Sequence, residues 1–172
     1  MKKLLTRTLG ISAGLLLATS AWGQGRSMPA SPARTSATVT ASDCWIRLLP
    51  SPAPSGGFLV AHNAGSADVV LTGASSPDYG MVMLHETTES GGMSKMAMVH
   101  RVAIAAGKDL VFKPGSYHLM LEKPREGLKI GDAVRLDFAL ANGEGFTATC
   151  EIKSPKALPP KSGQGMSGHM KH

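Results

Sequence analysis

The 172-residue chain has few aromatic and few charged residues: Phe, Trp and Tyr make up 5%, and Asp, Glu, Lys and Arg 17%. Its positive charge is not accompanied by a basic stripe with stacking aromatic residues, so we do not expect it to bind nucleic acid. Beyond the N-terminal segment, no apolar run is long enough for a membrane-spanning helix. The sequence shows no nucleophile beside its base, no paired-carboxylate site and no phosphate-binding loop. These absences favour a binding protein over an enzyme.

The first 23 residues have the features of an export signal. A basic start precedes an apolar stretch at residues 9–18, which is too short to span a bilayer comfortably. Ala21 and Gly23 supply small residues at a cleavage site, and we expect cleavage after Gly23 and a location in the periplasm. Removal of three basic residues lowers the formal charge from +6 to +3 (6 − 3 = 3). No cysteine follows directly, so we expect no lipid anchor and no membrane insertion after cleavage.

The remaining chain divides into three parts. Residues 24–37 are rich in Ser, Pro, Ala and Arg without hydrophobic periodicity, which predicts a disordered linker. Residues 38–154 contain many short strand patterns separated by Gly and Pro, which predict an all-β antiparallel sandwich or barrel. Residues 155–172 begin with prolines and predict a disordered tail. The length suits one compact domain, which we expect to be a monomer.

Four potential ligands of a soft metal lie in one stretch of the predicted domain. Ten residues separate His85 from Met96, twenty-one separate Met96 from His118, and one separates His118 from Met120. The last two lie in a predicted strand, where residues two apart point to the same side. Imidazole and thioether ligands without carboxylate or thiolate favour Cu(I), although any single methionine is more often a core residue.

This spacing resembles the H(M)X10MX21HXM signature of the PCu(A)C family of periplasmic copper chaperones. The flanking segments at residues 72–77, 84–86 and 113–120 also fit, and the resemblance covers residues 38–153. Thr87 departs from the pattern, because many relatives have a methionine shortly after the first histidine. The resemblance implies a cupredoxin-like β-sandwich of Greek-key type, with Cu(I) bound by His85, Met96, His118 and Met120.

Other methionines lie close to the four motif residues. Alternation in the strand places Met81 and Met83 on the side of His85. We expect Met81 to pack in the core and Met83 to shield the metal, with a role as alternate ligand left open. Met93 and Met98 flank Met96, and a role of either as an adventitious ligand stays open, although packing or surface positions are more typical of such residues. We interpret two further histidines outside the motif, His62 and His100, as structural or surface residues.

The two cysteines, Cys44 and Cys150, fall in the first and last predicted strands. An even number of cysteines in an exported protein predicts a disulfide. A blue-copper electron carrier would need a thiolate beside its histidines. No His or Met closely follows Cys150, so the disulfide is favoured over that alternative.

The C-terminal tail contains a Gly-rich His/Met tract. Such tracts bind metals, although composition alone is weak evidence. Some family members have similar extensions, and the resemblance implies a second, looser site there that suits Cu(II). Its candidate ligands are Met166, His169, Met170 and His172.

The function implied by the resemblance is copper delivery. The acceptor would be the CuA centre of cytochrome c oxidase subunit II, reached directly or through a Sco-type thiol protein. Two alternatives stay open: a periplasmic protein that buffers copper or confers resistance, and a copper-dependent oxidoreductase with an open coordination position.

Overall fold

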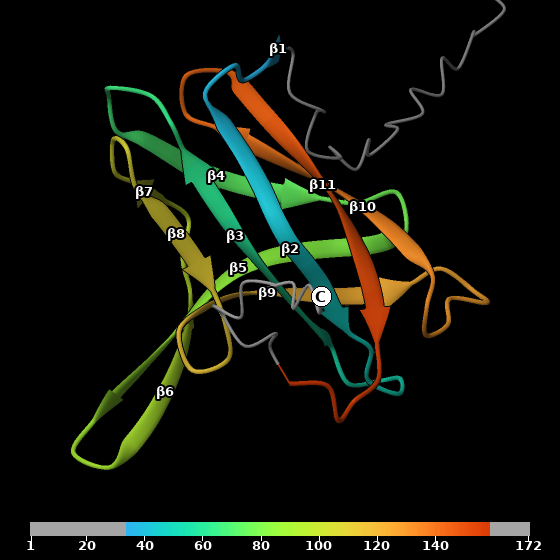
Figure 1. Ribbon diagram of the computed structural model, residues 1–172. Coiled ribbons are helices and arrows are strands. Elements are labelled where there is room, and N and C mark those ends of the chain that lie inside the picture. The colour runs from blue at the N-terminus through green and yellow to red at the C-terminus, as the bar shows by residue number, and fades with distance from the viewer. Residues whose placement is uncertain (1–33, 159–172) are drawn as a thin grey trace, which may run out of the picture.

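The computed structural model describes residues 34–158, which form eleven β-strands and no helix (Figure 1). The all-β prediction is confirmed. The strands are β1 (Arg34–Thr35), β2 (Val39–Arg47), β3 (Ser55–Asn63), β4 (Val69–Ser75), β5 (Tyr79–Ser90), β6 (Met93–Met98), β7 (Val102–Ile104), β8 (Asp109–Phe112), β9 (Tyr117–Pro124), β10 (Ala133–Leu140) and β11 (Glu144–Lys153). The predicted signal segment, most of the predicted linker and residues 159–172 of the tail lie outside the described residues.

The strands form one sheet in the order β6-β5-β9-β3-β2-β11-β10-β4-β7, with β1 beside β11 and β8 beside β3. Most neighbours are antiparallel, as expected. The pairs β2–β11 and β1–β11 are parallel, and the arrows of β2 and β11 point the same way in Figure 1. The first long strand of the domain therefore lies beside the last strand and parallel to it, a pairing that an antiparallel sandwich does not predict. At the β6 end of the strand order, β5 and β6 form a long hairpin that projects from the body of the domain (Figure 1).

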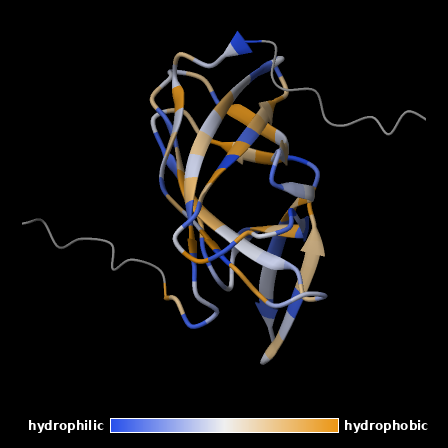
Figure 2. Ribbon diagram, turned by 90° about the vertical axis from the view of Figure 1, so that its right-hand side faces the viewer, coloured by the Kyte–Doolittle hydropathy of each residue, from blue (hydrophilic) through white to orange (hydrophobic). Residues whose placement is uncertain are grey.

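The single apolar core contains side chains from strands at both ends of this order. Leu84 of β5 and Leu119 of β9 belong to the same buried cluster as Leu71 of β4 and Val102 of β7. Apolar and polar residues alternate along the strands (Figure 2), because successive side chains point to opposite faces. Within the core, the rings of Phe138 and Phe146 stack at 4.6 Å between centroids. The sheet thus folds over on itself, with one face inside and the other exposed.

The folded part begins before the predicted boundary at residue 38. Arg34 and Thr35 pair with β11, and the buried Ser36 accepts a hydrogen bond from the Val39 amide through its Oγ (3.3 Å). The prediction that the linker extends to residue 37 is therefore wrong for residues 34–37. Strand pairing overrides their linker-like composition, because β11 supplies the backbone partners that a short polar segment cannot provide by itself.

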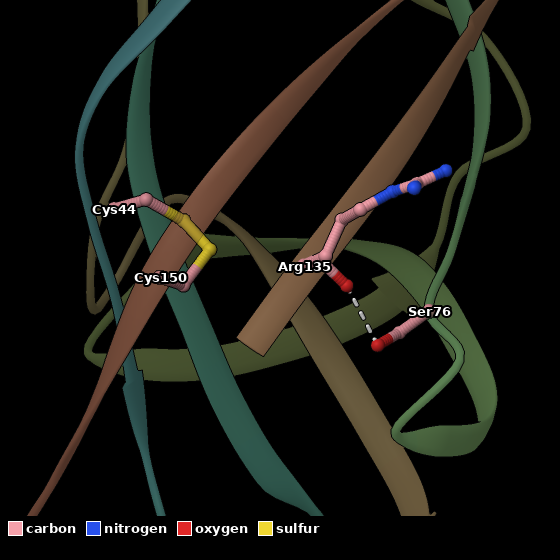
Figure 3. Close-up of a disulfide and its surroundings, with 4 residues drawn as sticks. All are labelled: Cys44, Ser76, Arg135 and Cys150. Atoms are coloured by element: carbon pink, nitrogen blue, oxygen red, sulfur yellow. Dashed lines mark hydrogen bonds between the residues drawn. A yellow bond between two sulfur atoms is a disulfide. The ribbon is translucent and has the colours of Figure 1, made fainter. Parts of the chain in front are cut away.

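The predicted disulfide between Cys44 and Cys150 is present and links β2 to its parallel neighbour β11 (Figure 3). A register shift between Ser42 and Trp45 marks a bulge, which adds one residue to β2. Near the bridge, the Ser76 hydroxyl donates a hydrogen bond to the Arg135 carbonyl oxygen (2.8 Å). The bridge joins the first long strand to the last one, with Cys150 in the core and the partly buried Cys44 packed against it.

No helix among residues 34–158 is long and apolar enough to cross a membrane.

Candidate metal site

The four predicted ligands come from three adjacent strands at one end of the sheet. His85 lies on β5, Met96 on β6, and His118 and Met120 on β9, and β5 pairs with both of the other strands. The ligands are thus held by backbone pairing, with no loop required to bring them together. The twenty-one residues between Met96 and His118 include β7 and β8, which lie elsewhere in the sheet.

Register places the ligands on one face. His85 is directly opposite His118, and the same alternation that buries Leu119 and Leu121 turns His118 and Met120 away from the core. Leu84 is likewise buried, so His85 points to the outer face. The two imidazole rings lie 5.8 Å apart between centroids, at an interplanar angle of 52°. The site is therefore on the outer face of β5, β6 and β9.

His118 is oriented by its own strand. Its Nδ1 lies 2.9 Å from the Ser116 carbonyl oxygen, which can only accept a hydrogen bond, so Nδ1 carries the proton. Nε2 then has a free lone pair, and it faces the Met96 sulfur at 3.2 Å. A carbonyl that fixes the tautomer of a metal-binding histidine in this way is typical of the surroundings of metal sites.

Met96 reaches His118 from two strands away. It is paired with Thr87 of β5, and β5 separates β6 from β9. Its side chain must therefore cross over β5, and the small side chain of Thr87 lies on the strand that it crosses. Met96 remains 51% exposed. The departure from the family pattern at Thr87 leaves the contact between Met96 and His118 intact.

His85 is half-buried, and its ring nitrogens have no polar partner. Both ring nitrogens are inaccessible to solvent and lack a hydrogen-bond partner in the described part of the chain. A buried polar group left unpaired costs about 1–3 kcal/mol, so its presence calls for an explanation. A role as a metal ligand would explain the missing partner, because coordination to a metal ion would satisfy the unprotonated nitrogen.

Burial lowers the pKa of His85 below its ordinary value of 6.5, and the neighbouring His118 lowers it further, while Glu122 acts in the opposite direction. Burial has this effect because it disfavours the charged imidazolium. The neutral form, which is the one that binds metals, therefore persists to lower pH than in a solvent-exposed histidine.

We predict that an NMR titration of the metal-free protein gives a midpoint for His85 below 6.5. The His118→Ala variant should move this midpoint upward, because a group that lowers the pKa is lost. Glu122→Gln should move it downward, because the carboxylate that favours the imidazolium is removed. A midpoint at or above 6.5 in the wild-type protein would contradict the buried, unpaired position of the ring.

Strand register determines where the other methionines near the site lie. Met83 is half-buried and directly opposite Met120, which fits the expected shielding position. The prediction that Met81 packs in the core is wrong: it is 42% exposed, because it lies on the outer face opposite Glu122. Met98 is directly opposite His85, a position that the linear sequence did not reveal.

A second group of polar side chains lies away from this site. His62 Nε2 is 2.7 Å from Ser42 Oγ, and His62 Nδ1 is 2.7 Å from Asp109 Oδ1. The Ser42 hydroxyl is also within hydrogen-bond distance of the Asp43 carboxylate (3.1 Å). These bonds connect β2, β3 and β8 on the outer surface. His62 is thus a hydrogen-bonded histidine at the surface, within the interpretation of it as a structural or surface residue. Its partners are up to 47 residues away, so the local sequence does not reveal them.

Among residues 34–158 there is no group of three or more His, Cys, Asp or Glu side chains that could hold a metal ion. The predicted donor set of two histidines and two methionines includes neither a carboxylate nor a thiolate. Thioether and imidazole donors suit Cu(I), whereas harder cations prefer oxygen ligands. Residues 166–172, which contain the predicted second site, lie outside the described residues.

The family model of the LpqE-like proteins, described as putative lipoproteins, matches residues 39–152. The chain belongs to this family. It is the PCuAC family that the motif spacing resembled, so that prediction is confirmed. A putative lipoprotein from Leifsonia xyli subsp. xyli is 28% identical over 148 residues, 84% of each chain.

Solved structures of PCuAC proteins are similar to this LpqE-like chain. The solution structure of CuI-DR1885 from Deinococcus radiodurans has a TM-score of 0.53 and 26% identity, and the match covers 70% of this chain and 81% of that one. The apo PCuAC domain of PmoF2 has a TM-score of 0.59 at 16% identity, covering 72% of this chain and 95% of that domain, and shows the fold alone. The predicted cupredoxin-like fold is thereby confirmed.

Proposed function

We propose that this LpqE-like protein is a periplasmic copper chaperone that binds Cu(I) through His85, Met96, His118 and Met120. The observation that carries the proposal is the convergence of these side chains on one sheet face. There, His118 Nε2 faces the Met96 sulfur at 3.2 Å and both nitrogens of His85 are buried without a partner. Family membership and the copper(I) form of DR1885 support copper as the metal.

The chemistry of the donors favours binding and transfer of copper over catalysis. Four neutral donors leave the bound Cu(I) with its single positive charge, and thioethers bind this soft ion without needing to lose a proton. Met96 is half-exposed, so an acceptor's ligand can approach the metal from that side and replace one donor at a time. The protein would thus release copper by ligand exchange, without catalysing a reaction.

The acceptor that we propose is the CuA centre of cytochrome c oxidase subunit II, reached directly or through a Sco-type protein. This part of the proposal rests on the family resemblance. A copper-buffering protein would have the same ligands but no dedicated acceptor, so the two functions differ only in transfer.

Transfer can be tested with the Cu(I)-loaded protein and a purified, metal-free, soluble CuA domain under anaerobic, reducing conditions. We expect the copper to leave the chaperone faster when the acceptor is present than when a small chelator of equal affinity is present, because docking would permit direct exchange. Copper can be quantified in each protein after separation, with a parallel arm that includes a Sco-type protein. Equal rates with the chelator, the CuA domain and the Sco-type protein would favour a buffer.

A further inference from the structure

We propose that Met98 is an additional copper ligand of this site, which takes Cu(I) together with His85 when the bond to Met96 breaks. The inference rests on the proposed function, because it assigns an exchange ligand to the same site. It would give the metal a second position nearer the exposed edge of the sheet.

The register places a donor on each side of His85. His118 of β9 is directly opposite on one side, and Met98 of β6 is directly opposite on the other. Side chains paired in this way have Cβ atoms about 4.5–5.5 Å apart and point to the same face. The imidazole of His85 is therefore the central member of a row that ends in a thioether.

Met96 and Met98 occupy different positions in this arrangement. Met96 is paired with Thr87 and crosses β5 to reach His118, so it would hold copper between the two histidines. Met98 lies in the row of His85 itself and is 50% exposed. Copper bound by His85 and Met98 would therefore lie on the side facing β6, which has no neighbouring strand beyond it in the sheet.

The environment of His85 is compatible with both positions. Its two nitrogens are buried and unpaired, and a nearby thioether cannot satisfy them because methionine has no hydrogen to donate. A metal ion between His85 and Met98 would satisfy the unprotonated nitrogen as well as one between His85 and His118. No hydrogen bond has to break at His85 when the metal changes sides.

The exchange is balanced without another reactant. One copper–sulfur bond to Met96 breaks and one copper–sulfur bond to Met98 forms, while the bond to His85 is kept. The bonds to His118 and Met120 on β9 also open as the metal moves to the side facing β6, and they form again if it returns. Both thioethers are neutral, so no proton moves, and copper remains Cu(I). The outward position then presents the metal to an acceptor.

The same strand supplies a matched control. Met93 is also on β6, but it pairs with Ser90 near the turn of the hairpin and, being an odd number of residues from Met98, points to the opposite face. Five residues of extended strand place it roughly 17 Å along β6 from Met98. Met93 is 75% exposed, so its replacement should not disturb packing.

The test compares three variants of the full mature chain: Met96→Leu, Met96→Leu/Met98→Leu and Met96→Leu/Met93→Leu. Leucine keeps the apolar volume and removes the sulfur. Cu(I) affinity is measured by competition with a chromophoric chelator, and the fold is checked by circular dichroism. We expect Met96→Leu to retain weakened binding, the added Met98→Leu to lower the affinity at least tenfold further, and the added Met93→Leu to change nothing. Equal affinities of the two double variants, or loss of all binding in Met96→Leu alone, would overturn the inference.

A site-specific readout uses the Met96→Leu chain, in which the bond to Met96 is absent, with 13C-labelled methionine methyl groups. One equivalent of Cu(I) should shift the Met98 methyl signal and leave the Met93 signal in place. An unshifted Met98 signal would overturn the inference even if copper binds. Failure of the proposed function is a different result: the wild-type domain would take up no Cu(I), or would keep its affinity when His118 and Met120 are both replaced.

Discussion

Removal of the Cys44–Cys150 disulfide is expected to lower the free energy of unfolding by about 4 to 5 kcal/mol. The bridge closes a loop whose ends are 106 residues apart, so its loss returns a large amount of conformational freedom to the unfolded chain. We suggest Cys44→Ser with Cys150→Ala, because Cys150 is fully buried and a hydroxyl there would add an unpaired polar group. Denaturant unfolding of the metal-free protein measures the difference.

Copper binding should survive this change. The disulfide lies between β2 and β11, whereas the proposed ligands lie on β5, β6 and β9. Chemical reduction of the wild-type protein provides a second measurement without any substitution, and it should give a similar loss of stability. A loss below about 1 kcal/mol in both experiments would contradict the chain-entropy argument. Loss of Cu(I) binding by a folded double variant would contradict the separation between the bridge and the site.

Replacement of both proposed ligands on β9, His118→Ala with Met120→Ala, is expected to lower the affinity for Cu(I) by roughly a thousandfold or more. Mutation of a group that merely supports a metal ligand costs about 10- to 100-fold, and here two direct ligands are lost. The fold should persist, because both side chains point away from the core while Leu119 and Leu121 remain buried beneath them. Competition with a chromophoric chelator measures the affinity.

The design needs two precautions. A chain ending at Lys161 removes the histidines and methionines of the tail while keeping every described residue, so the measured copper belongs to the folded domain. The matched control is His100→Ala with Met81→Ala, which removes the same two residue types from exposed positions outside the ligand set. This control should bind Cu(I) as the wild-type domain does. If the double ligand variant binds as tightly as the control, the ligand assignment is wrong.

Most strands follow from local pattern. The apolar segments at 102–104 and 133–140 form β7 and β10, and β9 begins at Tyr117 after the turn at Gly115. Alternation with buried residues such as Leu119 and Leu136 determines these elements, because each strand must bury one face. Strand ends were less predictable. β5 extends to Ser90, into a polar segment, because pairing with β6 continues as far as Met93.

The sequence by itself determined which residues could form the site. The spacing of His85, Met96, His118 and Met120 is a property of the chain, and the alternation within β9 places His118 and Met120 on one face. The count of two cysteines in an exported chain likewise led to the disulfide.

Only the tertiary structure decided how these residues meet. Register between strands depends on long-range pairing, and a shift of one residue would turn every side chain of β5 to the other face. That register brings Met98 opposite His85, and the path of Met96 across β5 brings its sulfur to His118. It also leaves Met81 exposed, because the outer face of β5 carries no covering layer at that position. Which methionine fills the core and which faces a metal is therefore a property of the sheet, because the side chain alone suits both roles.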